Sequence, residues 1–192
     1  MLEEIPKPIK ILDAGGTENF WMQMDFINLT NVSVTLLNSD NIKTTLPNFS
    51  FVKGDARDLN MFKDNEFDVV FSNSVIEHVG NFEEQKKMAN EIRRVGKRYF
   101  VQTPNYYFPI EPHFLFPFFQ FLPVKVKIFL VMQFDMGWFE KCKSAEKASM
   151  LISSIRLLKK KKLEELFPFS KIYNEKLFGL TKSHIITNKR NI

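Results

Sequence analysis

The stretch Asp64-Asn-Glu-Phe-Asp-Val-Val-Phe-Ser-Asn-Ser-Val-Ile-Glu-His78-Val carries the strongest local pattern in this sequence. Its middle, residues 67–72, is nearly all apolar, as expected for a strand that is buried on both faces of a parallel sheet. Ser72 and Asn73 stand at the carboxyl end of this predicted central strand. Ligands bind at that edge in open α/β sheets, so both residues are candidates for a site.

Short β-rich runs alternate with helical ones on both sides of the central strand, which favours βαβ units and a largely parallel sheet. A helix is predicted over 82–95, where four apolar residues share one face and Gly96 supplies the stop. A second helix is predicted over 160–167. Further strands are predicted over 9–13, 32–37, 49–52, 98–102, 172–178 and 183–187.

The last two predicted strands are joined by a tight turn at Gly179, so we expect them to be antiparallel. Parallel strands cannot be joined by so short a connection. The sequence therefore predicts an otherwise parallel sheet that ends in a reversed strand.

Composition and charge narrow the class of protein. The chain has 192 residues, 44% of them apolar, which suits a single domain over 1–192. The single Cys142 cannot form an internal disulfide, and the amino terminus lacks the order of a secretory signal, so we expect a cytoplasmic protein. The formal charge is +5, but the lysines are scattered apart from the run 159–162, so no nucleic-acid partner is expected.

The order of these motifs resembles the class I S-adenosylmethionine-dependent methyltransferases, particularly the branch called methyltransferase type 11. The resemblance covers roughly residues 9–103 and 156–187, and the passage that ends in Glu-His78 is its strongest local match. It implies an α/β, Rossmann-like, seven-stranded, mostly parallel sheet with an antiparallel last strand and helices on both faces. An aromatic-rich insertion at about 105–155 follows the fifth strand, and the implied cofactor is S-adenosyl-L-methionine.

The first strand ends in an acidic residue and a glycine-rich loop, as in that family. Glycines let the backbone approach a ligand closely, and the amino terminus of the following helix favours a carboxylate. The loop departs from the family's alternating glycines at Thr17 and Asn19. The resemblance assigns cofactor binding here to Asp13, Gly15, Gly16 and Thr17.

The resemblance assigns the rest of the cofactor to the ends of the next strands. Asn38 stands where the family generally has a carboxylate for the ribose hydroxyls, and Asp40 follows two positions on. Asp55 and Ala56 match the adenine-binding position. Ser72 and Asn73 fall near the methionine portion of the cofactor and the substrate.

His78 is the candidate for a proton-handling residue, because imidazole titrates near physiological pH. The alternative is a structural role in the first turn after the strand, and many methyl transfers need only alignment of the reacting groups. At the start of the insertion, Tyr106, Tyr107, Glu111 and His113 are candidates for the acceptor pocket. Glu111 and His113 could join His78 around a metal, but without known geometry no metal is expected.

The apolar segment 113–134 is broken by prolines and lysines and is too short to span a bilayer. It has three interpretations: helices packed over the sheet, a groove for an apolar acceptor, or a peripheral membrane contact.

We therefore expect methyl transfer to a small-molecule, apolar acceptor. The alternative is a non-catalytic binding or scaffold protein on a degenerate methyltransferase fold, motivated by Thr17, Asn19 and Asn38. A nucleic-acid methyltransferase is disfavoured because Ser72-Asn-Ser-Val is not the Pro-Pro-Tyr-like motif of base-methylating enzymes. An NAD-dependent oxidoreductase is disfavoured because Gly-x-Gly-x-x-Gly does not follow the first strand.

Overall fold

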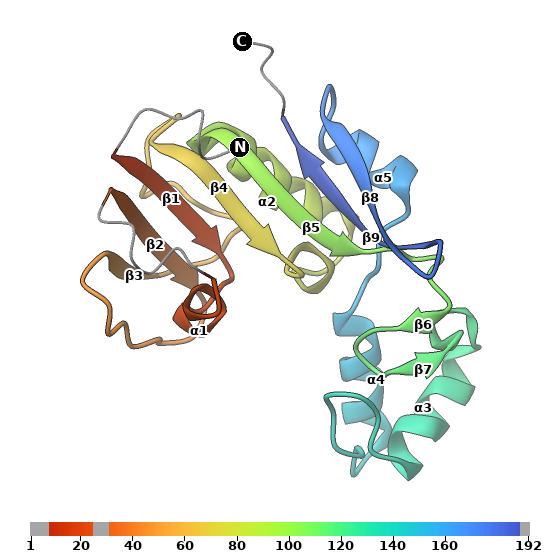
Figure 1. Ribbon diagram of the computed structural model, residues 1–192. Helices are drawn as coiled ribbons and strands as arrows, with labels where there is room; N and C mark the ends of the chain where they lie inside the picture. The colour runs from red at the N-terminus through yellow and green to blue at the C-terminus, as the bar shows by residue number, and fades with distance from the viewer. Residues whose placement is uncertain (1–7, 25–30, 189–192) are drawn as a thin grey trace.

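The computed structural model describes residues 8–24 and 31–188 (Figure 1). The main sheet has seven strands in the order β3-β2-β1-β4-β5-β9-β8. Their bounds are β1 (Ile9–Ala14), β2 (Val32–Asn38), β3 (Phe49–Lys53), β4 (Phe67–Asn73), β5 (Gly96–Pro104), β8 (Lys171–Leu177) and β9 (Leu180–Thr187).

Strand directions confirm the predicted sheet. β1 to β5 pair in parallel, and β9 is antiparallel to both of its neighbours, β5 and β8. Leu177 pairs with Leu180, so only Phe178 and Gly179 form the loop, with φ of 50° and 80°. Both values lie in the left-handed region that a two-residue hairpin of this kind requires.

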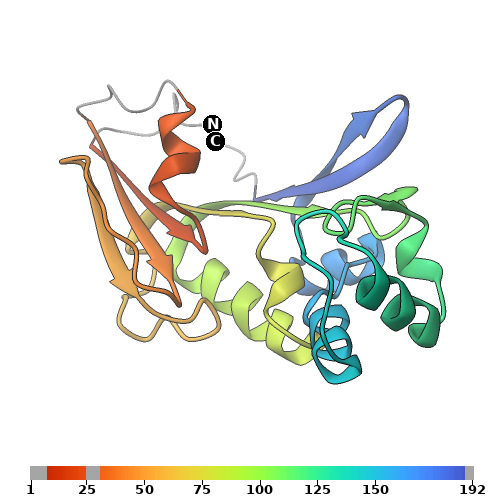
Figure 2. The ribbon, with the colours of Figure 1, turned by 90° about the horizontal axis from the view of Figure 1, so that it is seen from below.

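Helices cover the two faces of the sheet unequally (Figure 2). The short α1 (Glu18–Met22) lies on one face, while α2 (Phe82–Val95) and α5 (Lys160–Leu166) lie on the other. Alternating residues of β1 follow this division, because Ile11 packs in the cluster with Trp21 of α1 and Leu12 packs in the cluster with α2.

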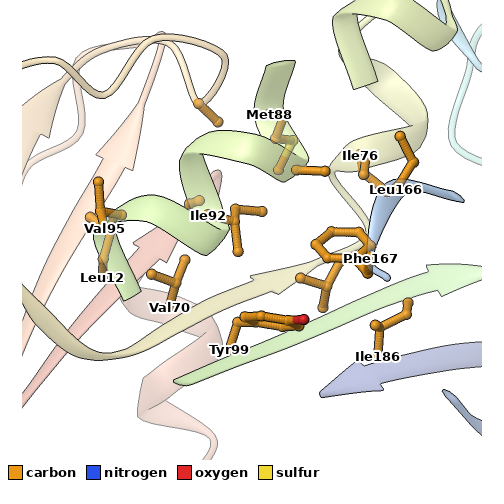
Figure 3. Packing of buried hydrophobic residues seen from close by; sticks show 14 of the residues in the cluster. Leu12, Val70, Ile76, Met88, Ile92, Val95, Tyr99, Leu166, Phe167 and Ile186 are labelled. Carbon is orange, nitrogen blue, oxygen red and sulfur yellow. The ribbon is translucent and has the colours of Figure 1, made fainter. Parts of the chain in front are cut away.

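The larger core lies between the sheet and α2 (Figure 3). Met88 and Ile92 of α2 are fully buried there against Val70 of β4, and Phe167 at the end of α5 closes the core beside Tyr99. The helix predicted over 82–95 is confirmed at both ends. Gly96 is also the first residue of β5, where a Cβ would lie only 2.6 Å from a methyl of Val70.

The insertion forms a separate lobe beyond the end of β5 (Figure 1). It contains β6 (Ile110–Glu111), β7 (Phe116–Pro117), the 3-10 turn η4 (Phe119–Phe121), α3 (Val124–Gln133) and α4 (Ala145–Ser154), and its aromatic residues pack in their own small core. The lobe begins at Asn105 and returns at Leu158, and these two residues form a parallel bridge. Among the described residues no helix is long and apolar enough to cross a membrane.

Candidate functional site

The loop after β1 is built around the buried carboxylate of Asp13. Asp13 Oδ2 accepts a hydrogen bond of 2.6 Å from Trp21 Nε1, while Oδ1 has no hydrogen-bond partner within residues 8–24 and 31–188. A Cβ on Gly16 would lie 1.7 Å from Asp13 Oδ2, so glycine is required there. Burial raises the pKa of Asp13 to about 7, although the hydrogen bond from Trp21 opposes the shift. Asp13 therefore shapes the loop from beneath.

Gly15 takes a φ of +92°, and a Cβ there would lie 2.6 Å from a methyl of Val75. Gly15 thus brings the loop against the segment that follows β4. Asn38, at the end of β2, fixes the other side of the loop, because its amide donates to the carbonyls of Gly15 and Gly16 at 3.4 Å each. Its side-chain carbonyl accepts from the backbone amide of Asp40 at 3.1 Å.

A cleft of about 580 Å³ lies between these segments and joins four of the predicted cofactor residues with His78. We call it the loop cleft. Its size is in the range of small-molecule sites. The lining residues singled out by sequence are Gly15, Asn38, Asp55, Ala56 and His78.

Asp55 borders this cleft, but its carboxylate already has a partner. Arg57 Nε lies 2.9 Å from both oxygens of Asp55, and Arg57 Nη1 bonds Glu84 Oε2 at 2.9 Å. The hydrogen bonds and charge of Arg57 lower the pKa of Asp55, so the carboxylate is ionised at neutral pH. A ligand amine at Asp55 would have to share these oxygens with the guanidinium.

The end of β4 separates the two residues predicted there. Ser72 is fully buried, and its hydroxyl donates to the carbonyl of Ala14 at 3.2 Å, so its side chain does not reach the loop cleft. Asn73 lines a second cleft instead. Ser74, which lines both clefts, has a φ of 54° and hydrogen-bonds Gln102 through its hydroxyl and its backbone amide.

The second cleft, which we call the apolar cleft, has a volume of about 660 Å³ and lies on the α1 side of the sheet. Its floor is the stacked pair Phe71 and Phe100, whose ring centroids are 5.2 Å apart. The insertion contributes apolar residues, and β8 and β9 contribute both polar and apolar ones. They include Phe108, Ile110, Leu115, Glu175, Lys182 and Ser183.

The predicted acceptor residues do not line the apolar cleft. Tyr107 is 59% exposed, and Lys159 Nζ lies over the rings of both Tyr106 and Tyr107. Tyr106 and Glu111 line a smaller pocket of about 250 Å³ beside the insertion core. Polar residues of the insertion were predicted from the sequence as the acceptor pocket, whereas apolar residues of the insertion line the apolar cleft.

His78 and His113 face each other, with Nε2 atoms 3.0 Å apart. His113 Nδ1 lies 2.7 Å from Glu111 Oε1, and Glu77 lies directly behind the pair with Oε1 3.9 Å from His113 Nε2. Partial desolvation beside its neighbours, and next the charge of His113, lower the pKa of the surface residue His78 to about 4, and burial raises the pKa of Glu77 to about 7. A base with so low a pKa accepts a proton poorly at neutral pH.

Sequence reasoning missed three residues that shape the site. Glu18 is buried at the start of α1 and accepts three hydrogen bonds of 2.8–3.0 Å from the backbone amides of Thr45 and Leu46. Burial alone would raise the pKa of Glu18, but these bonds outweigh it and lower the pKa. The other two missed residues are Arg57, which is two positions from Asp55, and Glu77, which precedes His78.

Strand order and the place of the two clefts define a Rossmann-like fold of the class I methyltransferase type. Residues 14–99 match the family model described as a methyltransferase domain. A solved S-adenosylmethionine-dependent methyltransferase from Methanosarcina mazei is similar over 97% of this chain and 94% of its own, with a TM-score of 0.59 at 13% identity. The CurJ carbon methyltransferase is similar over 97% of this chain and 50% of its own, with a TM-score of 0.60 at 9% identity.

Curated relatives match over a shorter stretch. Two uncharacterized proteins of Mycobacterium tuberculosis are 42% identical over 53 residues, which is 28% of this chain and 18% of each relative. The domain match thus covers the strands and helices from the end of β1 to the start of β5, and the fold of the whole described chain is that of the class I S-adenosylmethionine-dependent methyltransferases.

Proposed function

We propose that this protein binds S-adenosyl-L-methionine in the loop cleft and transfers its methyl group to a small, apolar acceptor in the apolar cleft. The observation that supports this most is the contact of the two clefts at the carboxyl edge of the sheet, where Ser74 lines both. A cofactor and an acceptor in adjoining clefts would meet there.

The residues of the loop cleft suit this cofactor. The positive φ of Gly15 and the amide of Asn38 shape the loop, and Ala56 and Asp55 form the opposite wall. When bound, the cofactor would supply an electrophilic sulfonium methyl group: a lone pair of the acceptor would form the new bond to carbon as the carbon–sulfur pair returns to sulfur, and the acceptor's proton would pass to solvent. The chain's own part is to hold the two molecules in line, which can supply a large share of the rate.

Calorimetric titration of S-adenosylmethionine and S-adenosylhomocysteine tests cofactor binding. We expect micromolar binding that Asp55→Ala and Gly15→Val each weaken at least about tenfold, because both residues line the loop cleft. Asp58→Ala and Gly179→Val are the matched controls. Asp58 is exposed near Asp55, and Gly179 has a similar positive φ with open space around it.

Absence of binding by the folded wild-type protein would overturn the proposal. That outcome would favour a scaffold on a degenerate methyltransferase fold. The pairing of Asp55 with Arg57 supports this alternative, because a carboxylate that is already neutralised gains less from a ligand.

The acceptor cleft can be tested separately with Ile110→Trp and Leu115→Trp. Both side chains are half exposed at the cleft, 45% and 57% respectively, so a larger ring can fill it without disturbing the core. We expect these variants to bind cofactor like the wild type and to lose methyl transfer to apolar acceptors. Unchanged transfer in both would place the acceptor elsewhere.

We also propose that the insertion makes a peripheral contact with a lipid surface. Its outer side chains support this, because several large apolar residues are exposed on a lobe that has its own core, as occurs on interaction surfaces. The exposed aromatic side chains include Phe118, Phe129, Phe134 and Trp138, at 55–77%.

A further inference from the structure

The junction between the main body and the insertion brings three possible metal ligands together. Glu77 and His78 belong to η3 (Ile76–His78), and His113 follows β6 in the insertion. One ligand atom from each residue lies within 4.8 Å of the others. Two imidazoles and one carboxylate are a common donor set for divalent transition metals.

Glu77 provides an independent reason to expect a cation. Its side chain is fully buried, and Oε2 accepts from the hydroxyl of Thr103 at 2.9 Å. Oε1, in contrast, has no hydrogen-bond partner among the described residues and lies 3.9 Å from His113 Nε2. Burying a carboxylate oxygen without a partner is costly, and a coordinated cation would remove that cost.

The two histidines are spaced as ligands of one ion would be. Their Nε2 atoms are 3.0 Å apart. Two nitrogens at about 2.0–2.1 Å from a shared ion are separated by roughly 2.9 to 3.4 Å when the angle at the metal is between 90° and tetrahedral. The observed distance falls inside that range.

Glu111 orients His113 for this task. Glu111 Oε2 accepts from the backbone amides of His113 and Phe114, and Oε1 lies 2.7 Å from His113 Nδ1. The contact with Glu111 occupies Nδ1, so Nε2 is the ring nitrogen that faces His78 and is available to a metal ion. This carboxylate–histidine arrangement typically lies behind histidine ligands of metals.

We propose that Glu77, His78 and His113 bind a divalent transition metal ion, with Glu111 as the positioning residue. The sequence alone led us to expect no metal, because the geometry of these residues could not be known. The three ligands leave a coordination position open, and His78 also lines the loop cleft. If the proposed methyl transfer holds, that position would bind an oxygen of the acceptor and favour its deprotonation.

The test uses the untagged full chain after treatment with a chelator. Zn²⁺ is titrated by calorimetry, and Co²⁺ is followed through its visible absorption bands, both without S-adenosylmethionine. We expect one ion per chain. His78→Ala and His113→Ala should each weaken binding at least about 100-fold, and Glu111→Gln about 10- to 100-fold.

Cys142→Ser and His184→Gln are the controls, because they remove the remaining cysteine and histidine without touching the cluster. We expect both to bind the ion like the wild type. His78 is exposed, so His78→Ala should fold even if a change at buried Glu77 does not. Circular dichroism checks each variant.

Absence of binding by the folded wild type, or binding that survives both histidine substitutions, would overturn the metal site. A separate titration of S-adenosylmethionine distinguishes the two proposals. Metal binding without cofactor binding would keep the metal site and remove methyl transfer. The opposite result would keep methyl transfer alone.

Discussion

Asp13→Asn should make the protein more stable at alkaline than at acidic pH, relative to the wild type. The carboxyl of Asp13 has a pKa of about 7 in the folded state against an ordinary value of 3.8. The folded protein therefore holds a proton that the unfolded chain releases, and wild-type stability falls as pH rises from about 4 through 7. Asparagine has no such proton and can still accept from Trp21.

The magnitude follows from the two pKa values. Folded-state and unfolded-state values of about 7 and 3.8 integrate to roughly 2–3 kcal/mol of lost stability between pH 5 and pH 8. The free energy of unfolding of the variant, minus that of the wild type, should rise by roughly this amount over the same interval. Taking this difference cancels the titration of the other groups.

Urea unfolding at pH 5 and pH 8, followed by far-ultraviolet circular dichroism, measures this difference. Fluorescence is less suitable because Trp21 touches the substituted side chain. A difference between variant and wild type that is the same at both pH values would refute the reasoning. It would mean that Asp13 is ionised in the folded protein at pH 5.

Gly16→Ala should lower the free energy of unfolding by about 2–4 kcal/mol, because a Cβ would displace the buried carboxylate beneath the loop. Gly179→Ala, at an open position with positive φ, should lower it by only about 1 kcal/mol. Equal losses in thermal unfolding would contradict this contrast. Glu18→Gln should lower the free energy of unfolding by about 1.5–3 kcal/mol at neutral pH, because it weakens the hydrogen bonds from the backbone amides of residues 45–46. Because the pKa of Glu18 is lowered, that difference should vanish on acidification through its folded-state pKa, and a constant difference would argue against it. Trp138→Ser should reduce sedimentation with anionic vesicles several-fold, and unchanged sedimentation would remove the lipid contact.

Sequence was a good guide to the main body because its signals are local. The apolar run of β4 and the one-sided apolar pattern of α2 each report burial directly, and both elements were predicted nearly to the residue. The short strands β6 and β7 were not predicted. Two-residue pairings leave no periodic pattern in a sequence.

Sequence was a weaker guide to the site, because partners distant in the chain decide what each side chain can do. His78 lines the loop cleft, but its lowered pKa comes first from desolvation by its surroundings and then from His113, 35 positions away. Ser72 stands at the ligand edge of its strand, yet it is turned inward to the carbonyl of Ala14. Asp55, which the motif assigned to adenine binding, borders the loop cleft, but its pairing with Arg57 depends on how the loop folds.

The two chain segments that join the insertion to the sheet lie side by side, which allows the insertion to vary in length. Asn105 and Leu158 meet in a bridge, and Arg156 is anchored by hydrogen bonds to Glu77 and Gln85. The chain therefore leaves the sheet and returns to it at nearly one point. Residues can be gained or lost between those two positions with little effect on the pairing of β5 with β9, since loop closure depends only weakly on length. The lobe can thus change its size and surface while the sheet that carries both clefts stays the same.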